Sequence, residues 1–90
     1  MDEDIIFKAL ADPTRRLILR ELSERKDQTL FELCGRLTMK HKVNMSRQAV
    51  TKHLGILEQS GLVRSEFRGK YRVLNFDKTP IDHITKRWSE

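Results

Sequence analysis

The sequence changes from helical to strand periodicity at Gly61, and this change limits the folds that the chain can adopt. Before it, the apolar spacing predicts a helix from Arg47 to about Ser60, which Gly61 ends. After it, residues 62–68 and 71–76 have the composition of two strands around a central glycine, which is typical of a β-hairpin with a short turn. A helix followed directly by a hairpin is therefore expected in the second half of the chain.

Two helices are predicted in the first third of the chain. Residues 3–11 carry an apolar stripe, with acidic side chains in the first turn. Asp12 and Pro13 then form a strong start signal, because Asp is a good N-cap and the missing N–H of Pro costs nothing at the first helical position. The second helix is expected to run to about Glu24.

Two further helices are marked by similar signals, and one stretch is left open. Thr29 is followed three residues later by Glu32, the spacing of a capping box that begins a third helix. Residues 38–45 could extend that helix or form a loop. Near the end of the chain, Thr79 is the expected N-cap and Pro80 the expected first residue of a last helix.

The expected fold is mainly α with a small β-hairpin wing, in the order helix, helix, helix, helix, strand, strand, helix. Helices three and four with their connector, followed by a basic hairpin, are typical of a winged helix-turn-helix. The 90 residues are enough for one domain, 1–90, but not for two.

The positive charge of the chain is concentrated in residues 34–72. The chain as a whole has a formal net charge of +5, whereas this segment alone carries +7. Its nine basic residues, against Glu58 and Glu66, are Arg36, Lys40, Lys42, Arg47, Lys52, Arg64, Arg68, Lys70 and Arg72. Such a concentration favours a polyanionic partner, nucleic acid before membrane, although a solvated basic face without a partner would look the same.

The helix that begins after Ser46 has an apolar side and a polar side. On a helical wheel the apolar positions Val50, Leu54 and Leu57 form one stripe. The opposite side carries Gln48, Thr51 and Lys52, whose side chains suit the edges of bases in a DNA major groove. Ser46 and Arg47 lie at the N-terminus, where the helix dipole favours a phosphate. The alternative is an ordinary surface helix whose polar side faces water.

The hairpin carries cations at its tip. Arg68 and Lys70 flank Gly69, a position suited to phosphates or to a minor groove. Phe67 and Tyr71, together with Val73, are expected to pack the hairpin on the domain. The alternative for the two cations is protection of an exposed sheet edge.

With these residues the sequence resembles the ArsR/SmtB-type family of prokaryotic winged-helix repressors. The resemblance covers residues 5–76. The two motifs that carry it are Phe7-Lys8-Ala9-Leu10-Ala11-Asp12-Pro13-Thr14-Arg15-Arg16 and Ser46-Arg47-Gln48-Ala49-Val50-Thr51-Lys52-His53-Leu54, the latter followed by Leu57-Glu58 and Gly61-Leu62-Val63. It implies a homodimer on double-stranded operator DNA, with a recognition helix at 46–60 and a wing near 68–70. It also implies that the terminal helices, 3–11 and 80–89, form the dimer interface.

The apolar residues of the terminal helices agree with that expectation. Ile5 and Ile6 on the first helix, and Ile81, Ile84 and Trp88 on the last, are more apolar surface than a small core can obviously cover. Packing within one protomer is the alternative. A dimer would place two recognition helices about 34 Å apart, on successive major grooves of a pseudo-palindromic site.

The sequence departs from the metal-sensing members of the family. They carry a paired-cysteine motif on the third helix, where this chain has Cys34 but Arg36 in place of the second thiol. The three histidines, His41, His53 and His83, lack partners at the spacing of the C-terminal metal site. No metal ligand is therefore expected. A metal or thiol-redox responsive repressor that senses through Cys34 remains an alternative.

Other classes of function are not expected. The sequence has no nucleophile–base pair and no phosphate-binding glycine loop, so no catalytic residue and no cofactor is predicted. No apolar run approaches the roughly 20 residues of a membrane span, and the acidic N-terminus is unlike a signal peptide. A cytoplasmic protein is expected, with an unknown inducer or partner protein left open. A winged-helix module for protein–protein contact is a further alternative.

Overall fold

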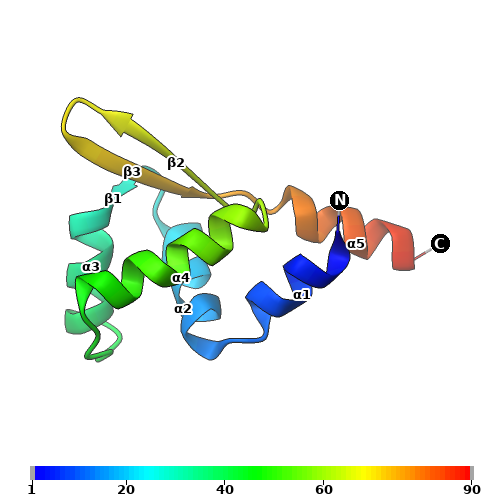
Figure 1. Ribbon diagram of the computed structural model, residues 1–90, viewed down its shortest axis with the longest axis horizontal. Coiled ribbons are helices and arrows are strands. Elements are labelled where there is room, and N and C mark those ends of the chain that lie inside the picture. The colour runs from blue at the N-terminus through cyan, green and yellow to red at the C-terminus, as the bar shows by residue number, and fades with distance from the viewer. Residues whose placement is uncertain (1, 90) are drawn as a thin grey trace.

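The computed structural model describes residues 2–89, and within them the chain forms five helices and a small sheet that lies along one side of the helices (Figure 1). In chain order the elements are α1 (Glu3–Leu10), α2 (Pro13–Glu24), β1 (Gln28–Thr29), α3 (Leu30–Met39), α4 (Arg47–Gln59), β2 (Val63–Arg68), β3 (Tyr71–Phe76) and α5 (Thr79–Trp88). The order of the four helices, the hairpin and the last helix is as predicted, and the arrangement is a winged helix-turn-helix. Figure 1 shows α3 and the hairpin tip at one end and α1 and α5 at the other.

Three of the predicted N-caps are confirmed. The Asp12 carboxylate accepts hydrogen bonds from the backbone N–H of Thr14 and of Arg15, at 2.8 and 3.1 Å. Thr29 and Glu32 form the complete capping box of α3. Ser46 Oγ, at the start of α4, accepts from the backbone N–H of residue 49 at 3.1 Å. These caps satisfy donors that the first turn of each helix leaves unpaired.

The predicted start of the last helix is wrong by one residue. Thr79 is already helical, and Lys78 occupies the cap position without a side-chain hydrogen bond. The backbone N–H of Thr79 donates to Asp77 Oδ1 at 2.9 Å. Asp77 therefore supplies the acceptor that was expected from Thr79, because it lies close enough to fold back on the helix start.

The core lies where α1, α2, α3, α4 and the sheet meet. Its fully buried large side chains come from every one of these elements and include Ile6, Ile18, Leu22, Leu33, Leu37, Leu54, Leu57, Leu62 and Leu74. The apolar stripe of α4 predicted from the helical wheel is fully inside this core, since Val50, Leu54 and Leu57 are all buried. The opposite side of α4 is therefore held outward.

The sheet has one strand more than the sequence predicted. β1 pairs antiparallel with β3 through Gln28 opposite Leu74 and Thr29 opposite Val73, which gives the strand order β1-β3-β2. The sequence does not predict β1, because two residues are too few to show a strand pattern. β2 and β3 form the predicted hairpin, and Gly69 has the positive φ of 62° that its turn requires.

The stretch 38–45, which the sequence left open, is divided between helix and loop. Residues 38 and 39 complete α3, and the remainder leads irregularly to the cap of α4. The loop is anchored to α2, because Lys40 Nζ and His41 Nε2 lie 3.1 and 3.0 Å from the buried carboxylate of Glu21.

Candidate nucleic-acid interface

The polar side of α4 is exposed along the half of the helix that begins at Arg47. Gln48, Thr51 and Lys52 are all exposed, as the helical wheel predicts. Because the opposite residues are fixed in the core, this side cannot rotate away from the surface. Gly55 follows on the same face, and a Cβ added there would meet nothing within 4 Å. The face can therefore approach a partner closely.

The N-terminus of α4 presents a second polar element. Ser46 caps the helix, and Arg47 is exposed in its first turn, which contains no acidic residue. Among residues 2–89 no carboxylate forms an ion pair with Arg47. Positive charge of the guanidinium and of the helix dipole therefore coincide here, which favours an anion such as a phosphate.

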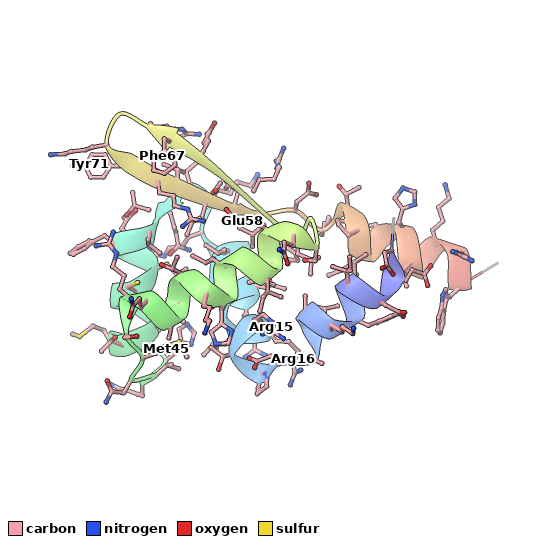
Figure 2. The ribbon with its side chains drawn as sticks, viewed as in Figure 1. Arg15, Arg16, Met45, Glu58, Phe67 and Tyr71 are labelled. Atoms are coloured by element: carbon pink, nitrogen blue, oxygen red, sulfur yellow. The ribbon has the colours of Figure 1, made fainter. Side chains whose placement is uncertain are left out.

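The hairpin lies above α4, as Figure 2 shows, and its outer part extends beyond the core. Of the three side chains expected to pack it on the domain, only Val73 is buried. Phe67 is 74% exposed and Tyr71 55% exposed, so the prediction is wrong for both. They pair with Arg72 and Arg68 in the last two rungs before the turn, at the outer end of the hairpin.

The two cations of the wing differ in their surroundings. Arg68 forms ion pairs with Glu66 at 2.6 Å and with Asp27 at 3.2 Å. The hydrogen bond to Glu66, followed by the nearby charges of Glu66 and Asp27, raises the pKa of Arg68. Lys70 Nζ instead lies 5.6 Å from the ring centre of Tyr71. Lys70 is therefore the more available wing cation, because the charge of Arg68 is largely compensated within the hairpin region.

Between the wing and α4 the structure has a groove of about 310 Å³. Arg47 and Thr51 line it from α4, and Lys70 and Arg72 line it from the hairpin. Arg72 Nη2 donates to both carboxylate oxygens of Glu58 at 2.9 Å, so one positive charge of the groove is matched by one negative charge. Glu58 is the one acidic residue of α4. Nothing near it in the sequence marks Arg72 as its partner, because this pairing depends on the position of the hairpin.

Cys34 does not have the features of a reactive thiol. It is half-buried, and burial raises its pKa, which the charge of Arg47 only partly offsets. Residues 2–89 contain no group of three His, Cys, Asp or Glu side chains that could hold a metal ion. None of the helices in this range combines the length and apolarity needed to cross a membrane.

The residues expected at the dimer interface differ in exposure. Ile5 and Trp88 are exposed, by 42% and 71%, and the rings of Trp88 and Phe7 meet edge to face at 6.2 Å between centres. Ile6, however, is only 1% exposed and belongs to the core, so its place on an uncovered surface is a wrong prediction. Its neighbour Ile5 faces the other way because successive residues point in different directions around a helix.

Ile81 and Ile84 take an intermediate position. Both are half-buried and pack against the core of the same protomer. The alternative of packing within one protomer therefore holds for part of their surface. The exposed large apolar side chains of the terminal helices are Ile5, Phe7 and Trp88 instead.

The sequence and the structure of the chain are both similar to those of known proteins. Residues 10–66 match a family model described as a helix-turn-helix domain. The chain is 54% identical over 89 residues to YuzN of Bacillus subtilis (strain 168), an uncharacterized helix-turn-helix-type transcriptional regulator, and the match covers 99% of this chain and 97% of that protein. It is 30% identical over 76 residues to the transcriptional repressor SdpR of the same organism, covering 84% and 77% of the two chains.

A solved structure agrees with these sequence matches. An ArsR-like transcriptional regulator from Rhodococcus sp. RHA1 superposes with a TM-score of 0.81 at 31% identity, over 96% of this chain and 72% of that one. The region matched in each comparison includes α4 and the polar side described above. The chain belongs to the ArsR-type family of winged helix-turn-helix transcriptional regulators.

Proposed function

We propose that the protein is a transcriptional repressor that binds double-stranded operator DNA as a homodimer. The observation that carries the proposal is the exposed side of α4, where Gln48, Thr51 and Lys52 stand opposite a fully buried apolar stripe. The names of two relatives support repression. One is the transcriptional repressor SdpR, and another is the arsenical resistance operon repressor of Escherichia coli (strain K12), 35% identical over 66 residues.

In this proposal α4 lies in the major groove. Gln48 can pair with adenine through two hydrogen bonds, Thr51 can contact a thymine methyl group, and Lys52 can reach guanine or a phosphate. Close approach requires that nothing bulky stands between the helix and the bases. The open space around Gly55 meets this requirement.

Phosphate contacts would come from two places. Ser46 and Arg47 lie at the positive end of α4, and Lys70 lies at the exposed end of the wing. Arg68 contributes only where a phosphate replaces Glu66 and Asp27 as its partner. These contacts do not depend on base sequence, so they supply affinity and its salt dependence rather than specificity.

The dimer would form through the terminal helices. Ile5, Phe7 and Trp88 leave an exposed apolar area on α1 and α5, at the opposite end of the molecule from the wing. Two copies joined there would present two α4 helices to one face of DNA, with centres about 34 Å apart. A pseudo-palindromic operator follows from this symmetry.

Gln48→Ala tests the proposed recognition helix. The purified protein is titrated against a labelled duplex from the DNA upstream of its own coding sequence and against a random-sequence duplex of equal length. We expect the variant to lose about 5- to 150-fold in affinity for the first in each half-site, and little for the second, because one bidentate base contact is worth roughly 1–3 kcal/mol and each protomer makes one. Equal weakening on both duplexes would show that Gln48 does not read a base.

A further inference from the structure

Three exposed aromatic side chains gather at the groove between the wing and α4. Phe67 comes from β2, Tyr71 from β3 and Phe31 from the first turn of α3, and all three line the groove. Phe31 is 78% exposed and Phe67 is 74% exposed. Figure 2 shows Phe67 and Tyr71 on the outer part of the hairpin.

The rest of the protein does not cover these three aromatic rings. Phe31 lies between the inward-facing Leu30 and Leu33, so its position on α3 directs it outward. Phe67 and Tyr71 lie beyond the part of the hairpin that the core covers. Large apolar side chains that cluster on a surface and are not covered by the protein itself are typical of a binding site.

The cations of the same groove specify the kind of partner. Arg47, Lys70 and Arg72 line it together with the aromatic rings, and within residues 2–89 only Arg72 is paired with a carboxylate, that of Glu58. Positive charges interleaved with apolar rings suit a molecule that alternates anionic and apolar groups. The sugar-phosphate strand of DNA has this alternation.

The positions of the wing and α4 indicate where that strand would lie. A helix in the major groove and a wing at the adjacent minor groove have one sugar-phosphate strand between them, because the strands separate the two grooves. The groove lies between these two elements and is lined by both. It is also continuous with the proposed base-reading face, since Thr51 belongs to both.

We propose that this groove is a cradle for one strand of the duplex, in which Phe31, Phe67 and Tyr71 contact the deoxyribose rings while Arg47 and Lys70 hold the flanking phosphates. The inference rests on the proposed DNA-binding function. It adds an apolar contribution to affinity that does not depend on base sequence and does not release counterions.

Phe31→Ala and Phe67→Ala test the cradle on a random-sequence duplex. Each variant is expected to lose roughly 5- to 30-fold in affinity, because burial of an aromatic side chain against a partner is typically worth about 1–2 kcal/mol. The slope of log affinity against log salt is expected to stay that of the wild type, because no charge is removed. Phe67→Leu, which keeps much of the apolar surface, should recover most of the loss.

Met39→Ala is the matched control. Met39 lies on α3 like Phe31 and is 75% exposed, but it does not line the groove. It should bind the duplex as the wild type does. Circular dichroism and thermal melting check that all variants fold, which is expected because the substituted side chains are mostly exposed.

The outcomes separate the cradle from the function on which it rests. If the wild type binds the duplex and both Phe→Ala variants bind equally well, the cradle is wrong and the DNA-binding function stands. A wild type that binds no duplex at low salt overturns both. If the variants bind a single-stranded oligonucleotide less well but the duplex normally, the groove serves unpaired nucleic acid and the cradle for a duplex is also wrong.

Discussion

The buried carboxylate of Glu21 on α2 accepts a hydrogen bond from Lys40 Nζ at 3.1 Å, across 19 residues of sequence. Gln28 Nε2 donates to the same carboxylate at 3.0 Å, and His41 Nε2 lies 3.0 Å from it. Glu21 therefore joins α2 to β1 and to the loop that leads into α4. A charged group with no exposed surface is tolerated here because both of its oxygens are hydrogen-bonded.

Glu21→Gln should lower the free energy of unfolding by about 1–3 kcal/mol. The amide keeps one acceptor oxygen but turns the other oxygen position into a donor, which then faces either the Gln28 Nε2 donor or the Lys40 ammonium. A buried polar group without its partner costs energy of that order. Chemical denaturation measures the loss. Glu24→Gln is the control, because Glu24 also pairs with Lys40, at 2.7 Å, but is about half exposed, and an exposed pair is worth little. Equal effects of the two variants would contradict the role of burial.

Stability should fall when the protein is acidified. Burial raises the pKa of Glu21, but hydrogen bonds from His41, Lys40 and Gln28 outweigh it and hold the pKa below the ordinary 4.5. The pKa of Asp12 is also lowered, mainly by the backbone N–H of Arg15. Because the pKa of Glu21 is lower in the folded protein than in the unfolded chain, its contribution to the free energy of unfolding is complete above about pH 4.5. That contribution is lost as the pH falls through the pKa of the folded state.

Urea denaturation between pH 7 and pH 3 measures this loss. Glu21→Gln should decline less steeply with acid than the wild type, because it no longer titrates at that site. A variant with the acid profile of the wild type would show that Glu21 does not contribute to it.

The local part of the fold could be predicted from sequence, and the part that depends on distant contacts could not. Asp12, Thr29 and Ser46 were identified as caps because a cap bonds to backbone only two or three residues away. β1 was missed because its evidence is the pairing of Gln28 with Leu74, 46 positions along the chain. Nothing in the sequence near Gln28 marks that partner.

The candidate site divides in the same way. The polar side of α4 follows from helical periodicity alone, so Gln48, Thr51 and Lys52 were found. Which hairpin side chains are covered depends on how far the strands extend past the core, so the prediction for Phe67 and Tyr71 was wrong. Hydrophobicity alone cannot distinguish a buried aromatic residue from one exposed for binding.

Lys70→Ala should weaken binding to all duplexes alike and make the salt dependence shallower by about two phosphate contacts, one from each protomer of the dimer. Lys70 lies in the groove and has no carboxylate partner among residues 2–89. Arg20→Ala is the control, because it removes one charge from the exposed side of α2, outside the proposed interface. Fluorescence anisotropy over a range of salt concentrations gives both slopes. An unchanged slope for Lys70→Ala would remove this residue from the interface.

Cys34→Ala should leave DNA affinity unchanged, with or without added zinc or oxidant. Burial raises the pKa of the thiol, so little thiolate is present at neutral pH, and the thiolate is the form that reacts and binds metal. Alkylation by iodoacetamide should therefore be slower in the folded protein than in the same protein in denaturant. Loss of DNA binding on adding zinc or peroxide, abolished by Cys34→Ala, would instead establish a sensor at this residue.

Trp88→Ala should weaken the dimer without unfolding the protomer. Trp88 is 71% exposed and contacts Phe7 at the end of the molecule where the terminal helices meet, and central aromatic residues carry much of the energy of an interface. We expect the dimer dissociation constant, measured by sedimentation equilibrium, to rise roughly tenfold or more, with a nearly unchanged melting temperature once the protein is monomeric.

Two control variants separate the dimer from the fold. Ile6→Ala should lower the melting temperature instead, because Ile6 is in the core and its truncation costs about 2–5 kcal/mol of stability. Met39→Ala, equally exposed but remote from the terminal helices, should change neither quantity. A Trp88→Ala protein that remains as dimeric as the wild type would exclude this residue from the proposed interface.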